Sequence, residues 1–370
     1  MTGPVAGWDR IVGQERAVAL LQRAAQRPVH AYLLVGPRGS GAEDAARCFA
    51  ATLIAPDDPR VWDLVQRGDH PDVFEFDPTG SEILVADARE LIREAHASPI
   101  EREHKVVVLL GADRLNDTAA NALLKTLEEP PARTTVILVA ERADRLPATI
   151  RSRCHRVDLD SLDEATVSAA LALDATLPGD RLALVARLSG GRLDRARLLG
   201  GRFGPLRDAF LDAVDSLDGT GAAVERAVEM LLDVVAGTVA ALEQRHAEEL
   251  ERLEADLEAA GYPSRVVGAR RKVLLARQKR EHRRARSDAW IEGFTAIESI
   301  YRDALAGQDA RALNLDRTAP AVHARGAVAA LDACRTARAG LIEFNANETL
   351  TLERLLLHLP AAGRGGRPPR

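Results

Sequence analysis

Short apolar runs alternate with amphipathic stretches over the first 157 residues. The runs are rich in Val, Leu and Ile and end at turn residues, which predicts strands at 31–35, 73–76, 106–110 and 135–140, with a short one near 157–159. The apolar spacing between them predicts helices over 14–25, 43–53, 86–97 and 116–127. Strands that alternate with helices predict a parallel sheet covered on both faces.

Strand signals vanish from about residue 160. Residues 161–200 are typical of a small helical unit, and 204–360 of a larger all-helical domain. We therefore expect an α/β domain over 1–157, a small helical domain over 158–203 and a large helical domain over 204–360. The Gly-, Pro- and Arg-rich tail 361–370 is predicted to be disordered.

The large helical domain contains two long stretches of opposite charge, separated by Gly261-Tyr262-Pro263. Residues 243–258 hold seven acidic and two basic residues, and 265–286 hold ten basic and one acidic. An antiparallel helical hairpin at about 225–308 would place these charges side by side. The alternative is a basic helix that faces DNA. Its candidate contacts are Arg270, Arg271, Lys272, Arg277, Lys279, Arg280, Arg283 and Arg284.

Composition narrows the class of protein without identifying it. The formal net charge of −5 over 370 residues gives the whole chain no nucleic-acid signature. Cys48, Cys154 and Cys334 lie too far apart for a metal-site spacing and indicate reduced thiols in a cytosol. No apolar run approaches the length of a membrane span, and no export-signal pattern is evident. We therefore expect a cytoplasmic protein without metal or membrane contact.

A phosphate-binding loop follows the first strand, but two of its residues are unsuited to phosphate. Gly36 and Gly41 stand where the P-loop turn needs glycine, with Gly39 between them in the same loop, whereas Ala42 and Glu43 occupy the places of the Lys and the Ser or Thr. An Ala cannot neutralise phosphate, and a carboxylate repels it. The loop predicts an NTPase fold that does not use nucleotide.

The second part of such a site is also missing. A P-loop ATPase carries acidic residues at the end of a buried strand, to organise magnesium and water. Here Leu110 and Gly111 stand at that end, and Asp113 is displaced, so we interpret it as a helix N-cap or surface residue. Two independent defects argue against ATP hydrolysis, and no nucleophile constellation takes its place.

Several motifs in order along the chain resemble those of the bacterial clamp-loader subunits of DNA polymerase III, an AAA+ family. They are Val12-Gly13-Gln14, His30–Pro37, Asn121–Pro131, the Ser152-Arg153-Cys154 motif within Leu146–Cys154, and Asn345–Glu353. The resemblance implies an AAA+ α/β module followed by an all-α lid, here 158–203, and an all-α collar, here 204–360. The charged hairpin resembles an elaboration of the actinobacterial type.

In that family the Ser-Arg-Cys arginine enters the ATP site of the neighbouring subunit as an arginine finger. The resemblance assigns this role to Arg153, with Ser152 and Cys154 as motif neighbours. A guanidinium suits the role because it is always charged, planar and multidentate toward phosphate. Arg151 lies beside it and is an alternative contact, and a surface arginine at a helix end is the simpler interpretation.

The chain also departs from the family. Its relatives usually carry a four-cysteine zinc module, but residues 55–71 hold no cysteine, and His70 alone cannot bind zinc. Ala140 or Glu141 replaces a polar sensor residue at the end of the fourth strand. Arg195 lies near a second phosphate-sensing position, and with no nucleotide to sense we expect it to be structural.

Set beside these motifs, the resemblance implies a subunit that cannot use ATP but completes the ATP site of another. Its expected partners are gamma/tau ATPase subunits and the delta subunit, with the sliding beta clamp and primed DNA in the same complex. We expect no cofactor. The chain alone would not be an ATPase, although it would be part of a DNA polymerase holoenzyme. The alternatives are an active gamma/tau-like ATPase and a DNA-binding protein acting through the basic helix.

Overall fold

The computed structural model describes residues 7–77, 82–174, 177–259, 264–307 and 312–360. The chain forms two compact units, Met1–Thr176 with Ser189–Ala196, and Leu177–Leu188 with Arg197–Arg370. The predicted tail 361–370 and the Gly261-Tyr262-Pro263 break lie outside the described residues. The boundaries expected at 157 and 203 stay a prediction.

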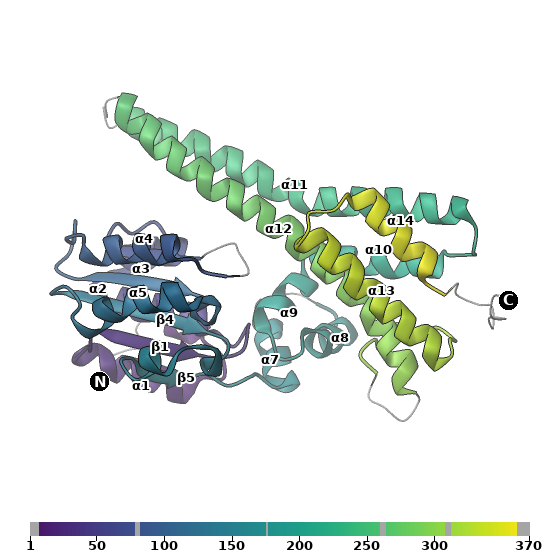
Figure 1. The fold of residues 1–370 in the computed structure, drawn as a ribbon, viewed down its shortest axis with the longest axis horizontal. Coiled ribbons are helices and arrows are strands. Elements are labelled where there is room, and N and C mark those ends of the chain that lie inside the picture. The colour runs from purple at the N-terminus through teal and green to yellow at the C-terminus, as the bar shows by residue number, and fades with distance from the viewer. Residues whose placement is uncertain (1–6, 78–81, 175–176, 260–263, 308–311, 361–370) are drawn as a thin grey trace. The chain divides into compact units, whose positions relative to one another are not determined.

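The first unit is built on a parallel sheet of five strands in the order β2-β3-β4-β1-β5 (Figure 1). The strands are β1 Ala31–Val35, β2 Val73–Phe76, β3 Lys105–Leu110, β4 Thr134–Ala140 and β5 His155–Asp158. All five predicted strands are confirmed, and the bounds differ by no more than two residues. The expected parallel α/β sheet followed by helical regions is also confirmed.

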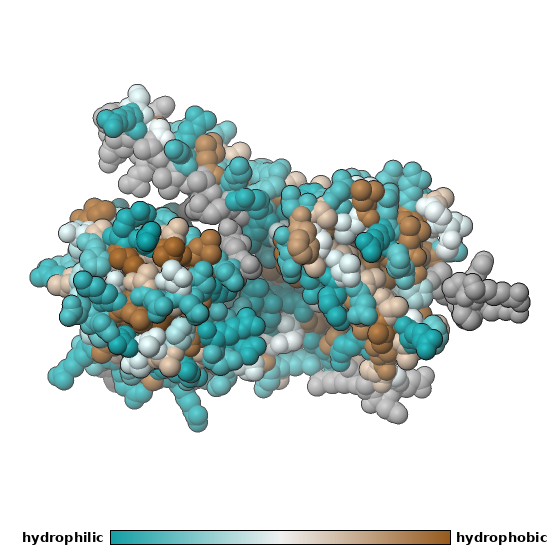
Figure 2. Space-filling view, viewed as in Figure 1, coloured by the Kyte–Doolittle hydropathy of each residue, from teal (hydrophilic) through white to brown (hydrophobic). Residues whose placement is uncertain are grey.

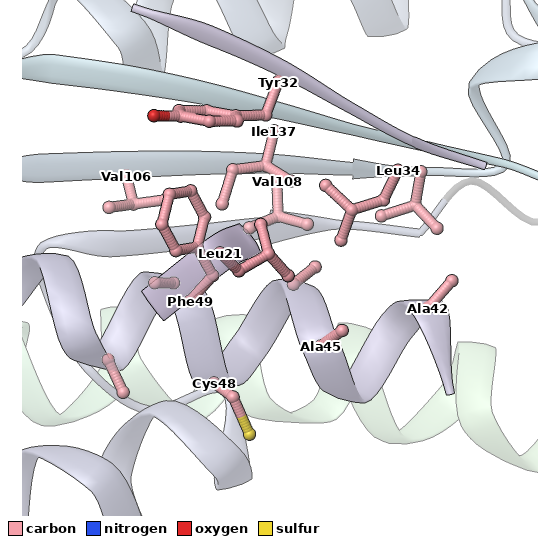
Figure 3. Packing of buried hydrophobic residues seen from close by; sticks show 14 of the residues in the cluster. Leu21, Tyr32, Leu34, Ala42, Ala45, Cys48, Phe49, Val106, Val108 and Ile137 are labelled. Atoms are coloured by element: carbon pink, nitrogen blue, oxygen red, sulfur yellow. The ribbon is translucent and has the colours of Figure 1, made fainter. Parts of the chain in front are cut away.

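Helices cover both faces of the sheet because alternate strand residues point to opposite sides. Tyr32 and Leu34 pack with the buried sides of α1, α2 and α3 (Figure 3), while Leu33 packs with those of α4 and α5. The helices of this unit are α1 Glu15–Gln26, α2 Ala42–Ile54, α3 Pro59–Arg67, α4 Val85–His96, α5 Asp117–Glu128, α6 Ala148–Arg151 and α7 Glu164–Asp174. Short 3₁₀ helices span Trp8–Arg10, Ala112–Arg114 and Ala143–Arg145. The four predicted helices are confirmed to within one residue at each end.

A helix occupies part of the stretch where relatives were expected to carry zinc. The Asp58 carboxylate caps α3 by accepting hydrogen bonds from the backbone N–H groups of Arg60 (3.0 Å) and Val61 (3.4 Å). Trp62 of α3 is buried against the α2 side of the sheet. Residues 59–67 are therefore held in place by the packing of an amphipathic helix against the sheet.

The second unit contains α8 Gly179–Ser189, α10 Phe203–Asp215, α11 Gly221–Ala259, α12 Ser264–Ala306, α13 Ala324–Ile342 and α14 Glu348–His358. Helix α9 Leu193–Gly200 begins in the first unit and ends in the second. On α12 the apolar residues at helical spacing, Trp290, Phe294, Ile297 and Tyr301, are all buried.

Helices α11 and α12 form the predicted hairpin, a long pair that lies side by side in Figure 1. Hydrogen bonds join Glu243 to His282 (2.8 Å) and His246 to Glu281 (3.1 Å), and an ion pair joins Glu254 to Arg271 (3.2 Å). Partners from the two helices run in opposite sequence directions, so the pair is antiparallel and opposite charges face each other. No helix in the described part of the chain is long and apolar enough to cross a membrane.

Candidate functional site

The glycine loop between β1 and α2 keeps the turn of a phosphate-binding loop. Gly39 and Gly41 have φ angles of 76° and 90°, in the left-handed region that favours glycine. The Gly36 N–H donates to the Ala140 carbonyl at the end of β4 (3.1 Å), and the Ser40 N–H donates to Pro37 (3.0 Å). The glycines are therefore retained for the connection between strand and helix.

The two residues that replace the Lys and the hydroxyl have structural places of their own. Ala42, at the start of α2, is 6% exposed and belongs to the hydrophobic cluster between α2 and the sheet (Figure 3). Glu43 is exposed in the first turn of α2, where a negative charge is favourable to the helix dipole. Neither residue offers a positive charge or a hydroxyl to a nucleotide.

Residues at the start of α9 lie directly on the glycine loop. A Cβ atom at Gly39 would come 2.2 Å from an Asp194 carboxylate oxygen and 2.7 Å from the Cα of Arg192. Leu193 N–H donates to the Gly39 carbonyl (3.4 Å). Burial alone would raise the pKa of Asp194, but the ion pair with Arg192 (2.9 Å) outweighs it and leaves that pKa lowered. This backbone therefore covers the loop at the place where only a glycine fits.

An arginine occupies the strand end where an ATPase needs carboxylates. Gly111 has φ 65°, and a Cβ there would lie 2.5 Å from the Nε of Arg114. The same guanidinium donates to the Leu110 carbonyl (3.4 Å) and lies 3.5 Å from Asp77. Burial, followed by the charge of nearby Arg38, lowers the pKa of Arg114. A cation here opposes magnesium binding.

The acidic residues near this strand end are engaged within the chain. Asp113 is partly exposed and accepts the Glu141 N–H (3.1 Å). The neighbouring helix N-caps are Gly111 and Asn116, so of the two roles expected for Asp113, helix N-cap or surface residue, only the second fits. The Glu141 carboxylate pairs with Arg38 (3.0 Å). Burial raises the pKa of Glu141 and Arg38 opposes that rise. The sequence offered no spacing rule that would have identified Arg38 and Arg114 as the residues at this site.

Arg153 lies at the surface in the turn between α6 and β5, and its guanidinium is held by four hydrogen bonds. Nε donates to Glu128 Oε1 (2.8 Å), one terminal nitrogen bonds to the same oxygen, and the other donates to the Thr149 carbonyl (2.9 Å) and to Ser152 Oγ (3.4 Å). The side chain remains 32% exposed. Glu128 was not singled out from the sequence, although it lies within the Asn121–Pro131 motif.

The neighbours of Arg153 differ in character. Ser152 is exposed and its hydroxyl donates to the Thr149 carbonyl (3.1 Å). Cys154 packs against the core on the α4–α5 side of the sheet, and burial raises the pKa of its thiol to about 12. A thiol with such a pKa is no nucleophile at neutral pH, so packing accounts for the Cys154 side chain.

The candidate DNA contacts do not lie on a single face of α12. Lys272, Lys279 and Arg283 are exposed, whereas Arg271 pairs with Glu254 of α11. Arg284 is exposed but takes part in an interaction within the chain. The side chains of Arg270, Arg277 and Arg280 lie outside the described residues.

His70 is buried, and its Nδ1 accepts the Asp72 N–H (3.1 Å). Burial lowers its pKa, and the Asp72 charge opposes that change. Among the residues that the structure describes, no group of three or more His, Cys, Asp or Glu side chains could hold a metal ion. The expected absence of zinc stays a prediction.

Comparison with known proteins finds relatives for the first unit of the chain. Residues 13–163, which include the glycine loop, Gly111 and Arg153, match the family model described as DNA polymerase III, delta subunit. The delta prime subunit of Escherichia coli K12 DNA polymerase III is 40% identical over 134 residues, which cover 36% of this chain and 40% of that subunit. The tau/gamma subunit of Haemophilus influenzae is 34% identical over 172 residues, 44% of this chain and 25% of that one.

A solved gamma-subunit-related protein from Thermotoga maritima aligns with 92% of this chain and 98% of its own, at 20% identity and a TM-score of 0.47. The chain spans less than half the length of the two curated relatives named above. Delta prime and tau/gamma subunits match at similar identity, so similarity alone does not separate the two types.

Proposed function

We propose that this chain, whose residues 13–163 match the delta-subunit family of DNA polymerase III, is a delta prime subunit of a clamp loader. It would hydrolyse no ATP itself and would supply Arg153 in trans to the ATP site of a gamma/tau subunit. The observation that carries the proposal is the contrast between two parts of one unit. The glycine loop is covered by Arg192 and Asp194 and lacks its cation, while Arg153 is presented at the surface.

The partners follow from the same assignment. We infer that the Arg153 side of the first unit faces a gamma/tau subunit and that the second unit forms the collar contact with other subunits. Val328, Leu350 and Leu357 are exposed apolar residues on α13 and α14, and hydrophobic residues appear on the visible face over these helices (Figure 2). Exposed apolar patches of this kind support a protein contact. The delta subunit, the beta clamp and primed DNA belong to the proposed complex.

The competing function is that of an active gamma/tau-like ATPase, which the sequence comparisons do not exclude. Four residues weigh against it. Ala42 and Glu43 offer nothing to the phosphates, and Leu110 and Gly111 offer nothing to magnesium. Magnesium-dependent ATP binding by the isolated chain would favour this alternative over our proposal.

The test is the ATPase rate of a reconstituted complex with gamma/tau and delta subunits of the same organism. Arg153→Ala should leave assembly intact and lower the rate. An arginine finger is worth roughly 10³-fold or more at a single site, and the remaining active sites dilute this in the whole complex. Arg151→Ala is made for comparison, because Arg151 is the exposed arginine two residues away that offers the alternative contact; the proposal expects the loss with Arg153→Ala alone. A normal rate with Arg153→Ala, or an equal loss with both variants, would refute the assignment.

A further inference from the structure

The outward face of α12 carries a stripe of basic residues. We define this basic stripe as Arg265, Lys272, Lys279 and Arg283, all exposed. At 100° per residue, the four lie within about 40° on the helix circumference, and they span about 27 Å along it. None of them forms an ion pair or hydrogen bond with another residue in the described part of the chain.

The stripe points away from α11 because the opposite side of α12 is used for packing. Leu274, Gln278 and Ala285 are buried on that side. Gln278 Nε2 donates to the His246 carbonyl (2.8 Å) and to Glu249 Oε2 (2.9 Å) of α11. The acidic residues of α11 therefore contact the side of α12 that packs against them, and the basic stripe lies on the opposite side.

The composition of this face favours a phosphate backbone over a protein partner. The positions along this face at helical spacing include Arg265, Gly268, Lys272, Lys279 and Arg283, and Leu275, which is 42% exposed, lies at its edge. Protein interfaces have an apolar core, whereas DNA interfaces are polar and strongly positive. The only carboxylate between residues 265 and 283 is Glu281, which pairs with His246.

We propose that the basic stripe of the hairpin binds the phosphate backbone of duplex DNA, without reading its sequence. The four basic side chains span about 27 Å, which is shorter than one helical turn of B-DNA, about 34 Å, so all four can contact phosphates within one turn. The contact is separate from the trans-acting role of Arg153 and does not depend on it.

Counterion release sets the size of the expected effect. Four neutralised phosphates give a slope of about −3.6 in a plot of log affinity against log salt concentration. Raising the salt from roughly 50 to 200 mM should therefore weaken binding by about 150-fold. A single-stranded ligand gives a shallower slope per contact, so the slope also reports which form of DNA the stripe prefers.

The experiment uses the full chain and a fluorescent duplex of about three helical turns, roughly 30 base pairs, with a single-stranded 5′ overhang. Fluorescence anisotropy gives the affinity across a salt series. The stripe variant replaces Arg265, Lys272, Lys279 and Arg283 by Gln, which preserves helix propensity. The control variant replaces four other exposed arginines of the second unit by Gln: Arg226, Arg245, Arg252 and Arg325.

We expect the stripe variant to lose most of the salt slope and to bind about tenfold or more weakly at 100 mM salt, while the control behaves as the unmodified chain. An Arg265→Lys, Arg283→Lys double variant should keep the slope, which separates charge from folding. Unchanged affinity of the stripe variant, or an equal loss in the control, would overturn the proposal. The proposal would also be overturned if the stripe variant still bound DNA but no longer co-purified with the other clamp-loader subunits, because the stripe would then bind an acidic protein.

Discussion

The ion pair between Arg153 and Glu128 leads to a prediction about the rate of the assembled complex. Arg153 donates two hydrogen bonds to one Glu128 oxygen, and this carboxylate competes with any phosphate for the guanidinium. If Arg153 reaches a neighbour's ATP, as we propose, the pair must break first. Glu128→Gln removes the negative charge and keeps the shape of the side chain, so it should release Arg153.

The structure limits the size of this effect. The Arg153 and Glu128 side chains are 32% and 48% exposed, so solvent screens the pair. Pairs of this kind are typically worth about 0.2–1 kcal/mol. The Thr149 carbonyl and Ser152 hydroxyl still hold the guanidinium after the substitution. Because kcat/KM compares the transition state with the free complex, we expect kcat/KM for ATP to rise by up to about fivefold.

The assay is steady-state ATP hydrolysis by the reconstituted complex at ATP concentrations well below KM. Glu129→Gln is the matched control, since Glu129 is the exposed neighbour of Glu128 and pairs with no residue that the structure describes. The expected result is a gain with Glu128→Gln alone. A loss of kcat/KM would contradict the reasoning, because Glu128 would then orient Arg153 for phosphate instead of restraining it. No change would show that the pair carries no measurable free energy.

Three further predictions concern the isolated chain. Arg207→Ala should lower the free energy of unfolding by about 3–5 kcal/mol in urea titrations, compared with exposed Arg226→Ala, because Arg207 is buried and bonds to Asn314 and Asp316. Burial would raise the pKa of Asp316, but the charge and hydrogen bonds of Arg207 outweigh burial and lower that pKa. The stabilisation by Arg207 is therefore full above the carboxyl pKa of the unfolded chain, about 4, and should be lost as the pH falls further. Equal stability of Arg207→Ala and Arg226→Ala at every pH would contradict this. Ala42→Lys with Glu43→Thr should still show no magnesium-dependent ATP binding by calorimetry, since Arg114 remains beside Gly111; micromolar binding would contradict it. Cys48 and Cys334 should resist iodoacetamide at pH 8, because burial raises the pKa of each thiol to about 12; rapid alkylation, followed by mass spectrometry, would show that these sites open.

Local pattern was enough to predict the strands and four helices of the first unit, and the helical class and the long hairpin of the second. Strands β1, β3 and β4 are rich in Val, Leu and Ile and end at turn residues, and the hydrophobic spacing of the predicted helices repeats with the helical period. The helix Pro59–Arg67 escaped because its nine residues span too few turns for a clear period. The sequence does contain one signal for this helix, Asp58-Pro59, which places a capping carboxylate directly before a proline in the first turn.

The candidate site divides in the same way. The glycines of the loop, the absence of a cation at Ala42 and the Ser-Arg-Cys motif are visible in the sequence, because each depends on residue type at fixed spacing. The covering of Gly39 by Arg192 and Asp194 joins residues more than 150 positions apart. No local pattern encodes that approach, since it depends on where the small helical region packs.

The sequence by itself determined the α/β architecture, the degenerate phosphate loop and the opposite charges of the two hairpin arms. Only the tertiary structure decided which charges meet. It turned Arg271 toward Glu254 and left Lys272 outside, although the two are adjacent in the chain. It also placed Glu128 against Arg153 and Arg114 against Gly111. The reason is geometric: residue type sets what a side chain can do, and packing of distant elements sets which partner it does it with.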